Sequence, residues 1–148
     1  MPRDPLSYKA SGAGQGHGRD APHGVERSKE RRVVFAKAVT RLFDFWQLGV
    51  PERLTLLGLA PGNRLALQRY ARGEPIAASR DALDRVGHLF GIQKSLELLY
   101  PRNAELQQAW MTSPNRKFHG RRPVDVVETH GLPGLALVRG TLDVMRGQ

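Results

Sequence analysis

The stretch SKERRVVFAKAVTRLFDFW, residues 28–46, decides the fold class because its apolar side chains recur at steps of three and four. An α-helix has about 3.6 residues per turn, so this spacing gathers the apolar side chains on one face. Ser28 belongs to the residue types that cap helix N-termini. We therefore predict a helix that starts at Ser28 and buries one stripe, formed by Phe35, Val39, Leu42 and Trp46.

Two short helices are predicted directly after this stretch. The first covers residues 51–58, where Gly58 permits a left-handed stop. The turn LAPG follows, and the second helix covers residues 63–72 with Leu65 facing inward. Two short helices across a tight turn are typical of a helix-turn-helix.

Helical patterns continue to the end of the chain, separated by turns that contain Pro and Gly. Ser79 is expected to cap a helix that Gly91 interrupts and that continues through residues 92–99. An ordered surface loop over residues 113–122 is expected to carry Phe118. Further helices are predicted over residues 103–112, 123–130 and from about 133 onward. In the last of these, one apolar stripe is expected from Leu135, Val138, Leu142 and Met145. No strand is needed, so the predicted fold is all-α.

Three regions follow from these patterns. Residues 1–27 contain several Gly and Pro and almost nothing apolar to bury, which predicts a disordered basic tail. Residues 28–91 form the predicted helix-turn-helix region. Residues 92–148 form a small helical domain that closes the chain.

Composition limits the classes of function. Lys and Arg number 23 against 14 Asp and Glu, and the net charge of +9 favours DNA, RNA or an acidic protein surface as partner. The chain has no Cys, which excludes a disulfide framework and fits a reducing cytoplasm. It has no apolar run long enough to span a membrane and no signal peptide at its start. The expected protein is therefore soluble and cytoplasmic.

No arrangement of residues indicates an enzyme. The five His residues are scattered, and no local signature links Ser, His and Asp into a catalytic set. We assign no catalytic residue, metal site or cofactor. Enzymatic activity is the remotest of the alternatives.

One helix has the composition of a DNA-reading helix. Its exposed positions are expected to hold four side chains that read base edges or hold phosphates, with no acidic residue between them: Arg64, Gln68, Arg69 and Arg72. An ordinary solvated helix face is the alternative interpretation. The preceding short helix and tight turn favour DNA.

The stretch from Gly91 to Gly147 resembles the C-terminal toxin-binding domain of the Xre/ParS/MbcA family of antitoxins. The matching features are a leucine-rich helix, a Trp near the end of the next helix, a Pro-Asn loop, an aromatic before Gly, a Pro that opens a short helix, and a closing helix. They lie at Leu96 and Leu99, Trp110, Pro114 and Asn115, Phe118 and Gly120, Pro123, and 138–147. The segment FDFWQLGVPERLTLLGLAPGNRLALQRYARG, residues 43–73, resembles the Xre-type helix-turn-helix of the same family.

The resemblance implies an antitoxin that neutralises a RES-domain toxin, an enzyme that consumes NAD or transfers ADP-ribose, and that represses its own operon. The implied partners are this toxin and operator DNA, bound by a homodimer within a hetero-oligomeric complex. We expect toxin contacts at Arg116, Lys117, Phe118, His119, Arg121, Arg122, Arg139 and Arg146. Core packing is the alternative interpretation for Trp110 and Phe118. A stand-alone helix-turn-helix transcriptional regulator is the alternative function.

Overall fold

The computed structural model describes residues 17–147, and in this part of the chain the fold is all-α, as predicted. The only β feature there is an isolated bridge between Asn115 and Arg121. In the first half lie helices α2 (His17–Phe45), α3 (Val50–Leu57), α4 (Arg64–Ala71) and α5 (Arg80–Leu99). In the second half lie α6 (Ala104–Ala109), the 3-10 turns η1 (Trp110–Thr112) and η2 (Arg116–Phe118), α7 (Pro123–His130) and α8 (Leu132–Gly147).

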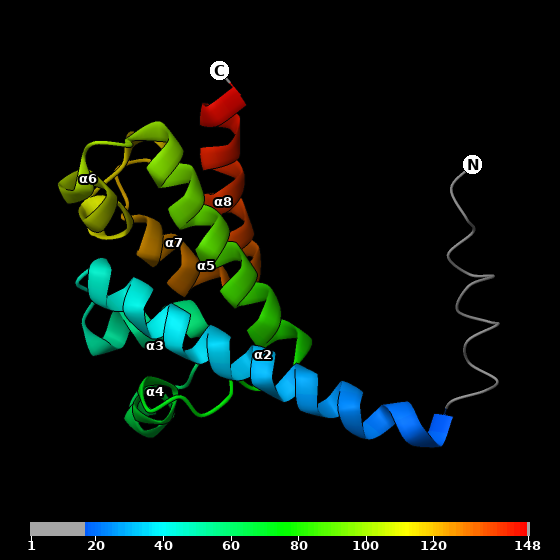
Figure 1. Cartoon of the computed structure of the whole chain (residues 1–148). Helices are drawn as coiled ribbons and strands as arrows, with labels where there is room; N and C mark the ends of the chain where they lie inside the picture. Colours follow the sequence, from blue (N-terminus) through cyan, green and yellow to red (C-terminus); the bar gives the residue numbers. More distant parts are fainter. Residues whose placement is uncertain (1–16, 148) are drawn as a thin grey trace, which may run out of the picture.

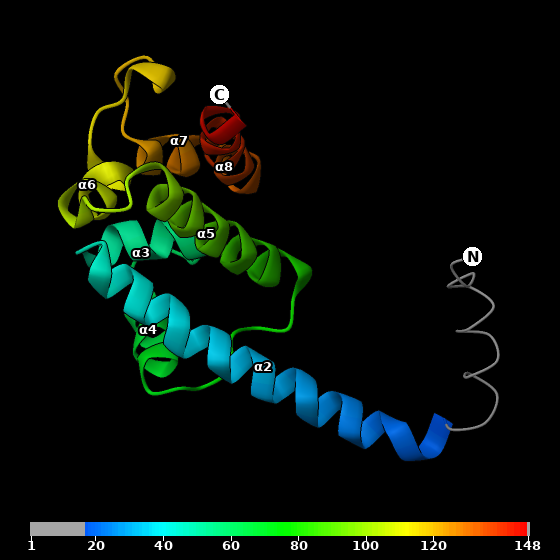
Figure 2. The ribbon, with the colours of Figure 1, turned by 45° about the horizontal axis from the view of Figure 1, so that its top comes forward.

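Helix α5 is the central element of the arrangement. Helix α8 runs beside α5 in the same direction, and α2 crosses below the pair with its N-terminal end extending away from the other helices (Figures 1 and 2). Helix α3 contacts α4, α5 and α7, while α4 packs against α2. The elements before and after α5 are therefore connected through it and through the contact between α3 and α7.

The buried apolar side chains form one continuous core. Phe43 and Trp46 enter it from α2, Leu89 and Ile92 from α5, and Leu135 from α8, and each of these side chains is at most 1% exposed. The core therefore extends across the predicted division between residues 91 and 92. The assignment of DNA binding to residues 28–91 and of toxin binding to residues 92–148 stays a prediction.

Local signals in the sequence explain several helix boundaries. The Ser79 hydroxyl accepts a hydrogen bond from the Ala82 backbone N–H at 3.2 Å, which confirms Ser79 as the cap of α5. Gly58 has φ +67° at the end of α3, which confirms the left-handed stop. Gly134 allows α8 to lie close to α7, because a Cβ there would lie 2.6 Å from the Val126 carbonyl oxygen.

The predicted start of the first helix is wrong. Helix α2 begins at His17 instead of Ser28, so residues 17–27 are helical and do not belong to a disordered tail. The sequence argument rested on the Gly and Pro residues and on the lack of apolar residues to bury. A helix that is already nucleated gains a backbone hydrogen bond for each residue other than Pro added at its end, and among residues 17–27 only Pro22 lacks the N–H. The remainder of the predicted tail, residues 1–16, lies outside the described residues.

Two further predictions fail for tertiary reasons. Gly91 does not interrupt its helix, because α5 is continuous to Leu99. A Cβ at Gly91 would lie 2.5 Å from Arg139 Cζ, so this glycine makes room for a side chain of α8. Leu65 is 50% exposed, whereas Leu67 and Tyr70 pack against the core. In a helix as short as α4, a few apolar residues do not fix which side faces inward.

Arg85 is a buried charged residue at the junction of several elements. Its side chain is only 10% exposed, and its Nε donates to Asp81 Oδ2 at 2.9 Å. Its Nη1 lies 3.4 Å from the Thr55 carbonyl oxygen and 3.5 Å from that of Leu56, near the C-terminus of α3. A buried guanidinium is tolerated only where its donors find partners, so these carbonyls fix α3 against α5.

We predict that Arg85→Met lowers the free energy of unfolding by about 1–3 kcal/mol, because the aliphatic stem stays packed while the buried hydrogen bonds are lost. Arg80→Met is the matched control, since the Arg80 side chain is 95% exposed on the same helix and its ion pair with Asp84 is 3.8 Å long. The control should change stability by less than about 0.5 kcal/mol. Urea unfolding measures both variants. Equal effects would contradict the role given to Arg85.

Candidate functional site

Helix α4 exposes the side chains predicted to bind DNA. Arg64, Gln68, Arg69 and Arg72 are all exposed, and the helix buries no residue fully. The Asn63 side chain accepts from the Ala66 N–H at 3.3 Å and caps the helix start. The structure therefore places Arg64, Gln68 and Arg69 on one short, exposed helix that is held from behind by α2, with Arg72 at its C-cap.

The sequence argument missed an acidic residue beside this helix. Glu74 Oε2 lies 3.9 Å from Arg69 Nε and 3.9 Å from Arg72 Nη2. Glu74 follows the helix in sequence, so a search for acids between the four predicted residues did not include it. Both contacts are long and exposed, which leaves the guanidinium groups able to bind phosphates instead.

The loop over residues 113–122 is ordered, as predicted. The Asn115 side chain accepts from the Lys117 N–H at 2.9 Å, and Asn115 N donates to the Arg121 carbonyl at 3.1 Å. Phe118 is only 5% exposed and packs edge-on against Trp110 with ring centroids 6.2 Å apart. Phe118 therefore belongs to the core of the described structure, and its contact with the toxin stays a prediction. Core packing, the alternative interpretation, is confirmed for both aromatic residues.

Arg121 and Arg122 hold the start of α7 in place. Arg122 makes two hydrogen bonds to the Asp125 carboxylate, each 2.8 Å long. Arg121 Nη2 donates to the Asp125 carbonyl at 2.9 Å and to Thr129 Oγ1 at 2.6 Å. The hydrogen bond from Arg122 lowers the pKa of Asp125 below its usual value. In this loop the exposed residues among the predicted contacts are Arg116, Lys117, His119 and Arg121.

Helices α5 and α8 share a line of polar contacts, which we call the α5–α8 polar seam: His88, Ser95, Arg139, Asp143 and Arg146. Arg146 Nη1 donates to Ser95 Oγ at 3.2 Å and lies 3.6 Å from Asp143 Oδ1. Arg139 Nη1 is 3.5 Å from His88 Nδ1. Arg139 and Arg146, both predicted as toxin contacts, are thus tied to the protein itself by internal contacts.

His88 gives the α5–α8 polar seam a pH dependence. Burial, and to a smaller extent the charge of Arg139, lowers the pKa of His88 below its ordinary value, while Asp84 and Asp143 act in the opposite direction. The unfolded chain therefore binds a proton at His88 more readily than the folded chain. Stability contributed by neutral His88 is present above the unfolded pKa of about 6.5 and falls as the pH is lowered below it.

We predict that His88→Gln reduces the loss of stability between about pH 7 and pH 5, because glutamine keeps a polar side chain that does not titrate. His119→Gln is the control, since His119 is exposed in the loop. Urea unfolding at several pH values measures the effect. An unchanged pH dependence in His88→Gln would show that protonation of other groups destabilises the fold.

Apolar residues missed by the sequence argument lie on the outer side of α8. Leu137 is 55% exposed and Val144 is 62% exposed. The sequence could have indicated them, because the helix contains more apolar residues than the single stripe of Leu135, Val138 and Leu142 requires.

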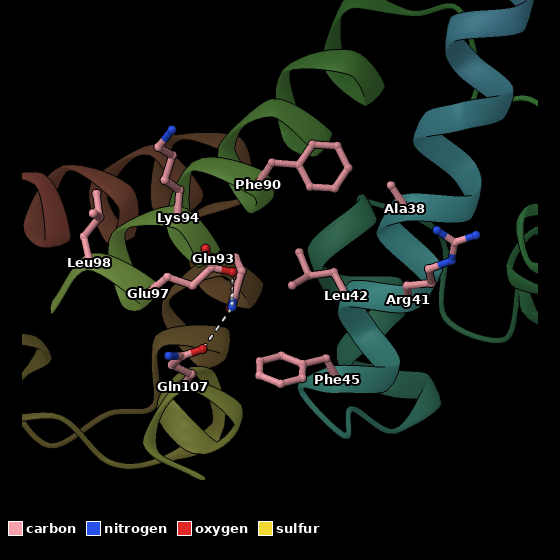
Figure 3. Close-up of a pocket in the computed structure, with 10 residues that line it drawn as sticks. All are labelled: Ala38, Arg41, Leu42, Phe45, Phe90, Gln93, Lys94, Glu97, Leu98 and Gln107. Atoms are coloured by element: carbon pink, nitrogen blue, oxygen red, sulfur yellow. Dashed lines mark hydrogen bonds between the residues drawn. The ribbon is translucent and has the colours of Figure 1, made fainter. Parts of the chain in front are cut away.

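A groove of about 520 Å³ separates α2 from α5 and α6. Phe45 and Leu42 line it from α2 and Phe90 from α5, as Figure 3 shows. At the α6 end, Gln93 Nε2 donates to Gln107 Oε1 at 3.2 Å. These two amides are therefore already engaged with each other within the groove.

Within the described residues, no group of three or more His, Asp or Glu side chains is arranged to hold a metal ion. In the same part of the chain, every helix is too short or too polar to cross a membrane.

Residues 95–147 match the family model described as the antitoxin Xre/MbcA/ParS C-terminal toxin-binding domain. The matched segment begins in α5 and includes α6, the loop, α7 and α8, about a third of the chain. No curated protein and no solved structure matches the chain. This part of the chain is thus similar to the toxin-binding domain of those antitoxins.

Proposed function

We propose that the protein is a non-enzymatic antitoxin that binds a RES-type toxin directly through residues 92–148 and represses its own operon through α3 and α4. The observation that carries this proposal is the match of residues 95–147 to a toxin-binding domain. The RES type of the toxin rests on the resemblance of the sequence to antitoxins that neutralise such enzymes. A stand-alone regulator would have α3 and α4 as well, but it would not need a toxin-binding domain.

The proposed mode of inhibition is steric. An NAD-consuming toxin has to bind a pyrophosphate, so its pocket is built to attract anions. The exposed cations Arg116 and Lys117 of the loop do not resemble such a substrate. The C-terminal helix, α8, is anchored on the core through Leu135, Val138 and Leu142 and can present a rigid surface. We infer that this part of the protein covers the mouth of the pocket instead of imitating the substrate.

We predict that the full chain restores growth and cellular NAD when co-expressed with its cognate RES-domain toxin. The double variant Arg64→Ala/Arg69→Ala should protect as well as the wild type, because α4 lies outside the matched segment. Growth curves and NAD measurements on the same cultures test both statements. A wild-type chain that neither binds the purified toxin nor restores NAD would contradict the antitoxin function.

The proposed DNA-binding surface is the exposed side of α4. Its four polar side chains can contact base edges and phosphates, and the net charge of +9 attracts DNA over a distance. One such short helix buries little surface, so specific binding requires two copies. A dimer with its α4 helices about 34 Å apart would read a palindromic operator.

We predict that Arg64→Ala/Arg69→Ala weakens binding to the promoter fragment by about tenfold or more, and that wild-type binding falls steeply with salt. Arg102→Ala is the control, because Arg102 is exposed in the turn between α5 and α6. Gel shifts at several salt concentrations measure the change. Wild-type affinity in the double variant would exclude α4 as the recognition helix.

A further inference from the structure

Helix α8 is apolar on two of its sides. Leu135, Val138 and Leu142 face the core and are fully buried, while Leu137 and Val144 are 55% and 62% exposed. A helix at the surface of a protein ordinarily carries one apolar stripe, with polar residues on the opposite side. A second apolar stripe is typical of a helix that is covered by its own core on one side and by a partner on the other.

Three exposed apolar residues and a half-buried glycine form one line, which we call the outer stripe: Pro133, Leu137, Gly140 and Val144. They are spaced by three and four residues, so they follow each other along one face of the helix. A Cβ built at Gly140 would meet no atom within 4 Å, so the middle of the stripe is open to a partner. A surface that approaches here can contact the helix backbone between the Leu137 and Val144 side chains.

The charged residues beside the outer stripe are turned toward the protein. Arg146 donates to Ser95 and pairs with Asp143, and Arg139 lies beside His88 with its Nε 4.0 Å from Asp143 Oδ2. Their side chains are 39% and 40% exposed, but recruiting either guanidinium to a partner would give up contacts of the α5–α8 polar seam. The outer stripe is therefore the part of α8 that a partner can cover without breaking a polar contact.

We propose that the outer stripe of α8 is the main contact for the toxin and that it fits an apolar groove on that protein. This inference rests on the proposed antitoxin function and adds the face and the chemistry of the interface. The occupant is the toxin because the stripe lies within the segment that matches a toxin-binding domain. Insertion of an exposed helix face into an apolar groove is a common mode of protein recognition, with anchors spaced as Leu137, Gly140 and Val144 are.

The test compares two double variants of the full chain. Leu137→Ser/Val144→Ser removes the two anchors of the outer stripe, and Val34→Ser/Leu65→Ser removes two similarly exposed apolar side chains from α2 and α4. Isothermal titration with purified, catalytically inactive toxin should show at least about 30-fold weaker binding for the stripe variant, and less than about threefold for the control. Thermal unfolding and promoter binding of the stripe variant should equal those of the wild type.

The salt dependence of the affinity for the toxin distinguishes an apolar interface from one formed by charged residues. Wild-type affinity for the toxin should change by less than about threefold between roughly 50 and 500 mM salt, because apolar contacts are not screened. A steep loss of affinity with salt, combined with weaker binding in Arg116→Ser/Lys117→Ser, would overturn the proposal in favour of the basic loop.

The remaining outcomes are distinguishable. If the wild type does not bind the toxin, the proposed function fails and this inference fails with it. If the wild type binds and Leu137→Ser/Val144→Ser binds equally well, the function stands and the outer stripe is excluded as the contact. Light scattering detects a third case, in which the stripe variant becomes monomeric yet binds toxin normally. The stripe would then be an interface between two copies, which also overturns the proposal.

Discussion

The hydrogen bonds of Arg85 join the central helix α5 to the C-terminal end of α3. A guanidinium at this depth needs partners, and it finds them in Asp81 on its own helix and in the carbonyls of Thr55 and Leu56 near the end of α3. A glycine leaves the space, because a Cβ at Gly58 would lie 2.5 Å from Arg85 Cζ. Gly131, between α7 and α8, is also a neighbour, since a Cβ there would lie at the ordinary contact distance of 3.8 Å from Arg85 Nη2. The end of α3 and the start of α8 therefore lie around the same side chain.

This arrangement makes the proposed DNA and toxin surfaces parts of one packed body. Helix α4 follows α3, α8 follows α7, and both α3 and α7 contact each other beside α5. A toxin bound on α8 would therefore be carried at a fixed place relative to α4. The sequence suggested two regions that meet at residue 91, but a continuous helix and a shared core connect them.

The features that the sequence predicted correctly are those that depend on neighbouring residues. A serine cap at Ser79 and a left-handed glycine at Gly58 involve only the local backbone, and the stripe of α8 that contains Leu135 needs only helical spacing. The failures involve contacts between distant segments. Gly91 is needed by Arg139, which is 48 positions later, and a helix-breaking effect was the only role visible from the local sequence.

The predicted toxin-binding residues show that basic side chains can also have internal partners. Three of them, Arg122, Arg139 and Arg146, lie beside a carboxylate, and Arg121 donates to a backbone carbonyl and a hydroxyl. The sequence does not reveal these partners, and contact of the four residues with the toxin stays a prediction. Basic residues on α4 remain available, apart from two long contacts with Glu74. In the proposed function, the basic residues of α4 attract DNA, while α8 offers an apolar face to the toxin. Two partners of different chemistry can then bind one small protein without competing for the same kind of contact, and salt would weaken only the binding of DNA.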